Sequence, residues 1–157
     1  TVSLAVPLYR QLELLKTYPK AIFGGIIAGV LTAMVSVFAL SLMLGLNHEQ
    51  YVTLLPKSIT TAIGMGISEK MGGIVTITVV VIIVTGILGN ILAETICRLC
   101  KIEDPIAKGL AIGTSAHALG TAKAMELGEI EGAMSSLSIV VCGILTVISV
   151  SIFANFI

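Results

Sequence analysis

The chain has 157 residues, of which 56% are hydrophobic and only 11% are charged, and its formal net charge is zero. Soluble domains carry about 25% charged residues, so this chain has too few charges to cover a water-facing surface. The composition therefore predicts an integral membrane protein of one domain, residues 1–157, and the lack of net positive charge argues against a nucleic-acid partner.

The first residues already have the character of a membrane element. The chain begins with Thr1, and residues 1–7 are almost entirely apolar, with no positively charged leader before them. We therefore expect that this chain is the C-terminal part of a longer protein and that further membrane segments precede it.

Three apolar runs are long enough to cross a bilayer as helices: residues 21–46, 74–93 and 133–157. Each reaches the roughly 20 residues that span about 30 Å of hydrocarbon. The many β-branched residues between 74 and 84 favour a strand in water, but a lone strand in lipid leaves its backbone unpaired. The sequence thus predicts an all-α polytopic membrane protein with three full transmembrane helices.

The basic residues predict the orientation of these helices. Six of the nine lie in two short segments, before the first span and after the second: Arg10, Lys16, Lys20, Arg98, Lys101 and Lys108. Short loops rich in Lys and Arg face the cytoplasm, so residues 47–73 start and finish on the outer side. Residues 58–68 are uncharged within this segment and too short to cross twice, which favours a re-entrant hairpin.

Residues 113–123 (GTSAHALGTAK) combine glycines, hydroxyls and one histidine near membrane-embedded segments. Irregular backbone at membrane depth is tolerated only where it lines a cavity, and ionisable side chains there are functional candidates by default. We therefore expect an interrupted segment here that forms a substrate site. Whether residues 105–131 are re-entrant or cross fully is left open.

Two units of the chain have a similar pattern. Residues 61–64 (TAIG) correspond to residues 117–120 (HALG), and each segment leads through a charged link into a span that contains Gly-Ile-Leu. Because the two units start on opposite sides of the membrane, the pattern indicates an inverted repeat, with units 50–93 and 105–157. Such repeats place a transport site between their interrupted segments.

Four blocks together resemble the LrgB/CidB family of bacterial inner-membrane proteins: residues 1–9 (TVSLAVPLY), 55–61 (LPKSITT), 113–123 and 129–133 (EIEGA). The resemblance covers essentially the whole chain. It implies additional N-terminal spans, a location in the bacterial inner membrane and a companion of the LrgA/CidA type. The chain departs at Ala62, where the family usually has proline, and at Lys123, where it usually has arginine; lysine loses bidentate recognition of a carboxylate.

The resemblance implies two functions. Plastid relatives export glycolate and glycerate and some bacterial relatives are associated with pyruvate, whereas bacterial members were named for holin-like control of murein hydrolases and lysis. We expect a carrier of small 2-oxo and 2-hydroxy monocarboxylates that works by alternating access, with H⁺ or Na⁺ as the coupling ion. The alternative is a holin- or antiholin-like regulator of murein hydrolase activity and cell lysis.

A carboxylate carrier needs hydroxyl and amide donors and a cation. The candidate substrate-binding residues are Ser58, Thr60, Thr61, Gly113, Thr114, Ser115, His117, Gly120, Thr121 and Lys123. Structural alternatives stand beside these roles, because membrane serines and threonines often bond back to their own helix. In the structural alternative, His117 packs between helices with its hydrogen bond satisfied, and Lys57 and Lys123 snorkel to the membrane interface.

Other features of the sequence indicate structure rather than chemistry. Gly25 and Gly29 form a GxxxG pattern that favours a close helix contact over a dedicated dimer face. Asn90 and Glu94 are spaced for a structural hydrogen bond, and the Cys97-x-x-Cys100 pair has no second pair to complete a metal site. We expect no enzymatic activity, no cofactor and no metal, and the oligomeric state is open.

Overall fold

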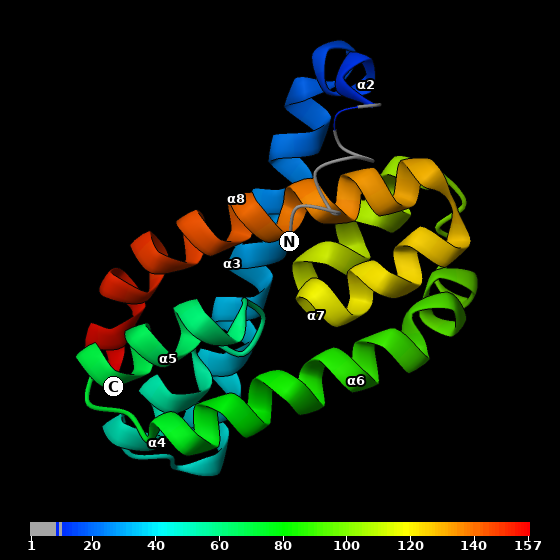
Figure 1. Cartoon of the computed structure of the whole chain (residues 1–157). Coiled ribbons are helices and arrows are strands. Elements are labelled where there is room, and N and C mark those ends of the chain that lie inside the picture. Colours follow the sequence, from blue (N-terminus) through cyan, green and yellow to red (C-terminus); the bar gives the residue numbers. More distant parts are fainter. Residues whose placement is uncertain (1–8, 10) are drawn as a thin grey trace.

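The computed structural model describes residue 9 and residues 11–157 as helices joined by short turns (Figure 1). In chain order the elements are α2 Leu12–Thr17, α3 Pro19–Leu44, α4 His48–Leu54, α5 Thr61–Lys70, α6 Val75–Leu99, α7 Pro105–Leu127, α8 Glu129–Phe153 and a 3₁₀ helix Ala154–Phe156. No strand occurs among these residues, so the predicted all-α class is confirmed. Residues 1–7, for which the sequence predicted a membrane element, lie outside the residues that the structure describes.

Three of the described helices are long and apolar enough to cross a membrane: Pro19–Leu44, Val75–Leu99 and Glu129–Phe156. They confirm the three predicted spans, and two boundaries shift by four residues or more. The second helix continues six residues beyond residue 93, because Glu94 and Arg98 pair on its surface and extend it past the apolar run. The third begins at Glu129, since acidic residues in a first turn favour the helix N-terminus.

Helices α3, α7 and α8 share one core. The buried side of α3 presents Ile22, Ile26, Val30 and Met34 at four-residue spacing, the periodicity of one helix face. These side chains pack in a cluster with residues of α8 such as Met134. The opposite sides of α3, α6 and α8 leave large apolar side chains exposed, which in a bilayer is the lipid-facing surface.

Two short helices, α4 and α5, connect α3 to α6 (Figure 1). With 7 and 10 residues they are too short to cross a bilayer. A buried hydroxyl cluster holds them against α6: the Thr78 hydroxyl donates to the Thr53 carbonyl at 2.9 Å and lies 2.8 Å from the Ser68 hydroxyl oxygen. A pair of non-crossing elements is thus present, while its re-entrant placement stays a prediction.

The interruption expected within residues 113–123 is confirmed at one position. These residues lie in α7 and are helical except at His117, whose φ of 42° and ψ of −136° break the helix at one point. The glycines serve packing instead: a Cβ added at Gly113 would lie 2.6 Å from the carbonyl oxygen of Ser135 in α8. Small residues let helices approach closely in membranes, so glycine here marks a helix crossing.

Candidate functional site

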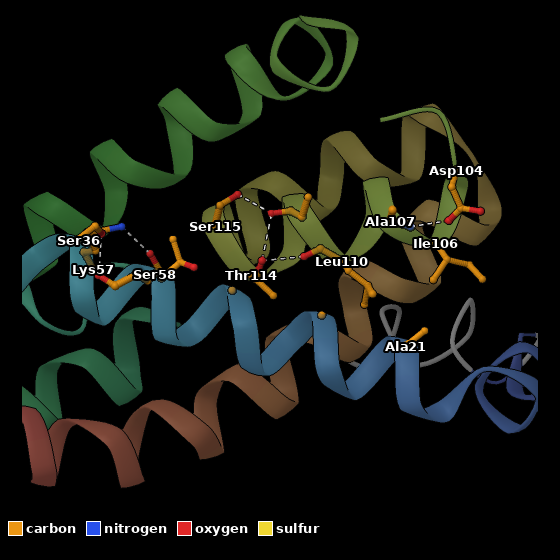
Figure 2. A pocket seen from close by; sticks show the side chains of 15 residues that line it. Ala21, Ser36, Lys57, Ser58, Asp104, Ile106, Ala107, Leu110, Thr114 and Ser115 are labelled. Atoms are coloured by element: carbon orange, nitrogen blue, oxygen red, sulfur yellow. Dashed lines mark hydrogen bonds between the residues drawn. The ribbon is translucent and has the colours of Figure 1, made fainter. Parts of the chain in front are cut away.

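A cavity of about 610 Å³ runs between α3 and the first half of α7, and we call it the α3–α7 groove. It extends along α3 from Ala21 to Ser36, which at 1.5 Å per residue is about 22 Å. Figure 2 shows Lys57 and Ser58 at one end and Asp104 and Ile106 at the other. Its lining residues are Ala21, Gly25, Gly29, Thr32, Ala33, Ser36, Lys57, Ser58, Asp104, Ile106, Ala107, Leu110, Ala111, Thr114 and Ser115.

The groove exists because both of its walls consist mainly of small residues. A Cβ added at Gly29 would lie 2.8 Å from the Thr114 hydroxyl oxygen, and one added at Gly25 would lie 3.2 Å from the Leu110 side chain. The close contact predicted for Gly25 and Gly29 is therefore confirmed, and it is made with α7 of the same chain.

One end of the groove holds a cation without a carboxylate partner. The Lys57 ammonium donates to the Ser58 hydroxyl oxygen at 2.9 Å, and no ion pair among the described residues includes Lys57. Burial lowers the pKa of Lys57, which lies in the turn outside the three spans. At the far end, Asp104 is engaged differently, since its carboxylate accepts the Ala107 backbone N–H and caps α7.

The hydroxyls in the middle of the groove donate to their own helices. Thr114 donates to the Leu110 carbonyl at 2.8 Å, and Ser115 donates to the Ala111 carbonyl at 2.7 Å. Ser36 on α3 does the same with the Ala33 carbonyl. These oxygens can still accept hydrogen bonds, but the donors that remain for an anion are concentrated at Lys57 and Ser58.

The structure brings three of the ten predicted site residues to the groove, namely Ser58, Thr114 and Ser115. The other seven lie elsewhere. Thr60 precedes α5 and Thr61 begins it. A Cβ added at Gly120 would lie 3.2 Å from the Ile112 carbonyl oxygen. Gly113 has the α8 contact described above, and His117, Thr121 and Lys123 face other helices.

His117 lies against α6, away from the groove. Its Nε2 is 3.0 Å from the Ile82 carbonyl oxygen, and the residue is only 5% exposed. The ring fits a notch at Gly86, because a Cβ there would lie 2.7 Å from the imidazole Cε1. This geometry is that of the helix-packing histidine that the sequence left open.

Polar contacts fix the second half of α7 to its neighbours. The Thr121 hydroxyl donates to the His117 carbonyl at 2.9 Å and lies 2.7 Å from the Ser135 hydroxyl of α8. The Lys123 ammonium is 3.1 Å from the Glu126 carboxylate and 3.9 Å from that of Glu94 in α6. The Ser135 contact joins α7 to α8 and the Glu94 contact joins it to α6, so Thr121 and Lys123 have structural partners.

Asn90 adds a further link between α6 and α7. Its side-chain amide donates to the Leu119 carbonyl at 2.7 Å, just beyond the break at His117. Glu94 also pairs with Arg98 one turn along α6. Asn90 and Glu94 therefore both have structural roles, but each bonds to a partner other than the one that their spacing suggested.

Sequence reasoning missed the contribution of α3 to the groove. Thr32 and Ser36 of α3 line the groove, and Asp104 lines its far end. Lys57 was considered in the sequence only as a residue that contacts substrate or snorkels. A signal was present in the four-residue spacing of small residues along α3, which begins with Ala21 and Gly25 and continues to Ala33. That spacing shows a smooth helix face but does not identify the helix that packs on it.

Comparison with known proteins gives one consistent result. The model of a family described as the LrgB-like family matches residues 1–156. Proteins named "Antiholin-like protein LrgB" from Bacillus cereus (strain B4264) and from Bacillus anthracis (strain A0248) are each 38% identical over 157 residues. Each alignment covers all of this chain and 68% of the relative. No solved structure matches the chain.

Proposed function

This chain belongs to the LrgB-like family, and we propose that it is an antiholin-like protein of the bacterial inner membrane, without enzymatic activity. In this role it restrains the membrane permeabilisation and murein hydrolase activity that lead to lysis. The observation that carries the proposal is the 38% identity to proteins named antiholin-like, maintained over the whole chain. It favours the alternative function raised from the sequence over the carrier.

The fold is compatible with a regulator that acts within the bilayer. Helices α3, α6 and α8 expose apolar residues such as Leu31, Ile83 and Ile144, and these surfaces contact lipid or the helices of a membrane partner. The proposal includes a membrane partner of the LrgA/CidA type. Gly25 and Gly29 face α7 inside the chain, so a partner contact would use another side of α3.

Lysis kinetics test the proposal. A bacterial host that lacks its own LrgB-like protein is given a holin-like membrane protein alone or together with this chain in its full-length context. We expect the chain to delay the fall in optical density and to lower murein hydrolase activity in the medium. Identical lysis curves at equal expression of both membrane proteins would exclude an antiholin-like role.

A second function, carriage of small 2-oxo or 2-hydroxy monocarboxylates, is favoured by a specific observation in the α3–α7 groove. Lys57 has no carboxylate partner among the described ion pairs, and Ser58 lies beside it. A carboxylate there would accept charge-assisted hydrogen bonds from the ammonium. Alternating access and coupling to H⁺ or Na⁺ are part of this second proposal.

Uptake into proteoliposomes tests the carrier. Labelled pyruvate, glycolate and glycerate are offered with and without a pH or sodium gradient. If the groove carries these anions, Lys57→Met lowers saturable uptake about tenfold or more, the loss expected for a hydrogen bond to a charged group. Lys20→Met is the matched control, because Lys20 is exposed and does not line the groove. Absence of saturable uptake by the unmodified protein would remove the carrier.

A further inference from the structure

A second cavity, of about 310 Å³, lies where α6 ends, and we call it the α6-end pocket. Figure 1 shows the end of α6 and the connection between α7 and α8 at the same end of the molecule. The pocket is lined by residues of α6, the following loop and both ends of α7: Glu94, Cys97, Arg98, Lys101, Ile102, Glu103, Lys108 and Leu127. None of the functions discussed above uses it.

Lys101 occupies a backbone position that glycine normally takes. Its φ is 53°, and the Ile102 N–H bonds to the Cys97 carbonyl at 2.9 Å, the pattern that closes a helix through a left-handed residue. A lysine here is strained where glycine would not be. No ion pair among the described residues includes its ammonium, so helix closure does not account for the choice of side chain.

Lys108 is placed against the local electrostatics. It is the fourth residue of α7, near a helix N-terminus, where the helix dipole favours anions over cations. Like Lys101, it has no ion-pair partner in the described part of the chain. Two cations without an ion-pair partner among the described residues therefore line one cavity, where an anion between them would pair with both.

The charge and shape of the pocket indicate the kind of anion. Three cations (Arg98, Lys101, Lys108) and two carboxylates (Glu94, Glu103) line it, which leaves a net charge of +1. Arg98 and Glu94 neutralise each other at 3.0 Å. Ile102 and Leu127 add an apolar wall, so a singly charged group attached to an apolar body matches the lining.

The position of the pocket in the chain places it at the expected depth of lipid headgroups. The candidate span α6 ends at Leu99, so the residues that follow it meet the interface between hydrocarbon and water. Ile96 and Leu99 are exposed apolar residues next to the pocket. We propose that the α6-end pocket binds the phosphodiester of an anionic phospholipid, with the phosphate between Lys101 and Lys108 and the acyl chains along α6.

Lipid binding to the full-length protein in detergent tests this site. Native mass spectrometry counts retained phosphatidylglycerol and phosphatidylcholine for the unmodified protein, for Lys101→Gly and for Lys101→Gly/Lys108→Gln. Lys101→Gly relieves the backbone strain while removing the charge, so loss of binding is not loss of fold. The control is Lys16→Gln/Lys20→Gln, which removes two exposed basic residues outside the pocket.

We expect the unmodified protein and the control to prefer phosphatidylglycerol. Lys101→Gly should lower this preference roughly fivefold, the factor expected for one basic residue near an anionic membrane surface, and the double variant should lower it further. Equal preference in all variants would overturn the site. Binding of inorganic phosphate as tight as that of the lipid would overturn the lipid assignment and leave a site for free phosphate.

Discussion

At the scale of single residues, His117 shows how a helix break is held in place. A residue with a Cβ at φ 42° is strained by about 1–3 kcal/mol. The hydrogen bond between its ring and the Ile82 carbonyl, together with the ring's fit at Gly86, holds the side chain in this position. The break thus depends on contacts with α6.

Paired substitutions separate the backbone strain from the ring contact. His117→Ala and His117→Gly both lose the hydrogen bond to Ile82, but only alanine keeps a Cβ at the positive φ. We expect the free energy of unfolding of the glycine variant to exceed that of the alanine variant by about 1 kcal/mol. The glycine variant should therefore unfold at a higher temperature. Thermal unfolding in detergent measures this, and a more stable alanine variant would show that the backbone relaxes into a continuous helix.

At the scale of elements, the crossing of α7 and α8 depends on residues without side-chain bulk. A Cβ at Gly109 would lie 2.5 Å from the Glu131 carbonyl oxygen, and one at Gly113 would lie 2.6 Å from that of Ser135. Both obstacles are backbone atoms, which cannot move aside as a flexible side chain can. The crossing therefore tolerates no larger residue at these points.

Gly113→Ala tests this packing with a matched control. The substitution should destabilise the protein by about 1–3 kcal/mol, as overpacking does. Gly24→Ala, where a Cβ would meet nothing within 4 Å, should change stability by less than about 0.5 kcal/mol. Comparison of the two unfolding temperatures in detergent checks the expectation, and equal temperatures would mean that α7 and α8 are not in close contact at Gly113.

Sequence patterns predicted the three spans because length and apolarity alone decide which segments can cross a bilayer. Over residues 113–123 they predicted the interruption, which lies at His117, but they missed the role of Gly113, which permits close packing between α7 and α8. The groove was predicted only at Ser58, Thr114 and Ser115. Its α3 wall depends on which helix packs on Gly25 and Gly29, and no local pattern contains that tertiary contact.

At the scale of the whole molecule, a group of basic residues lies in the segments around the starts of α3 and α7, whereas Lys57 lies at the other end of the groove. Ala21, near the start of α3, and Ile106, near the start of α7, line the same end of the groove. In the chain, Lys16 and Lys20 shortly precede Ala21, and the cations of the α6-end pocket lie on both sides of Ile106. Short basic segments face the cytoplasm, so this end is expected inside the cell.

Thiol labelling tests that orientation with a native residue. Cys100 is exposed, whereas Cys97 and Cys142 are buried. A membrane-impermeant maleimide should label Cys100 in inside-out vesicles and leave it unlabelled in intact spheroplasts. In a Cys100→Ala background, Glu49→Cys at the start of α4 should show the reverse. Labelling of Cys100 from the outside would reverse the topology proposed here.

The measurement that tests the central claim most directly compares lysis and uptake in the same cells. A host without its own LrgB-like protein receives a holin-like partner together with either the full-length protein or its Lys57→Met variant. An antiholin-like role predicts that both proteins delay lysis equally, whatever the uptake of labelled pyruvate. If neither protein delays lysis while saturable pyruvate uptake appears and is lost in Lys57→Met, the protein is a carrier and the account is contradicted.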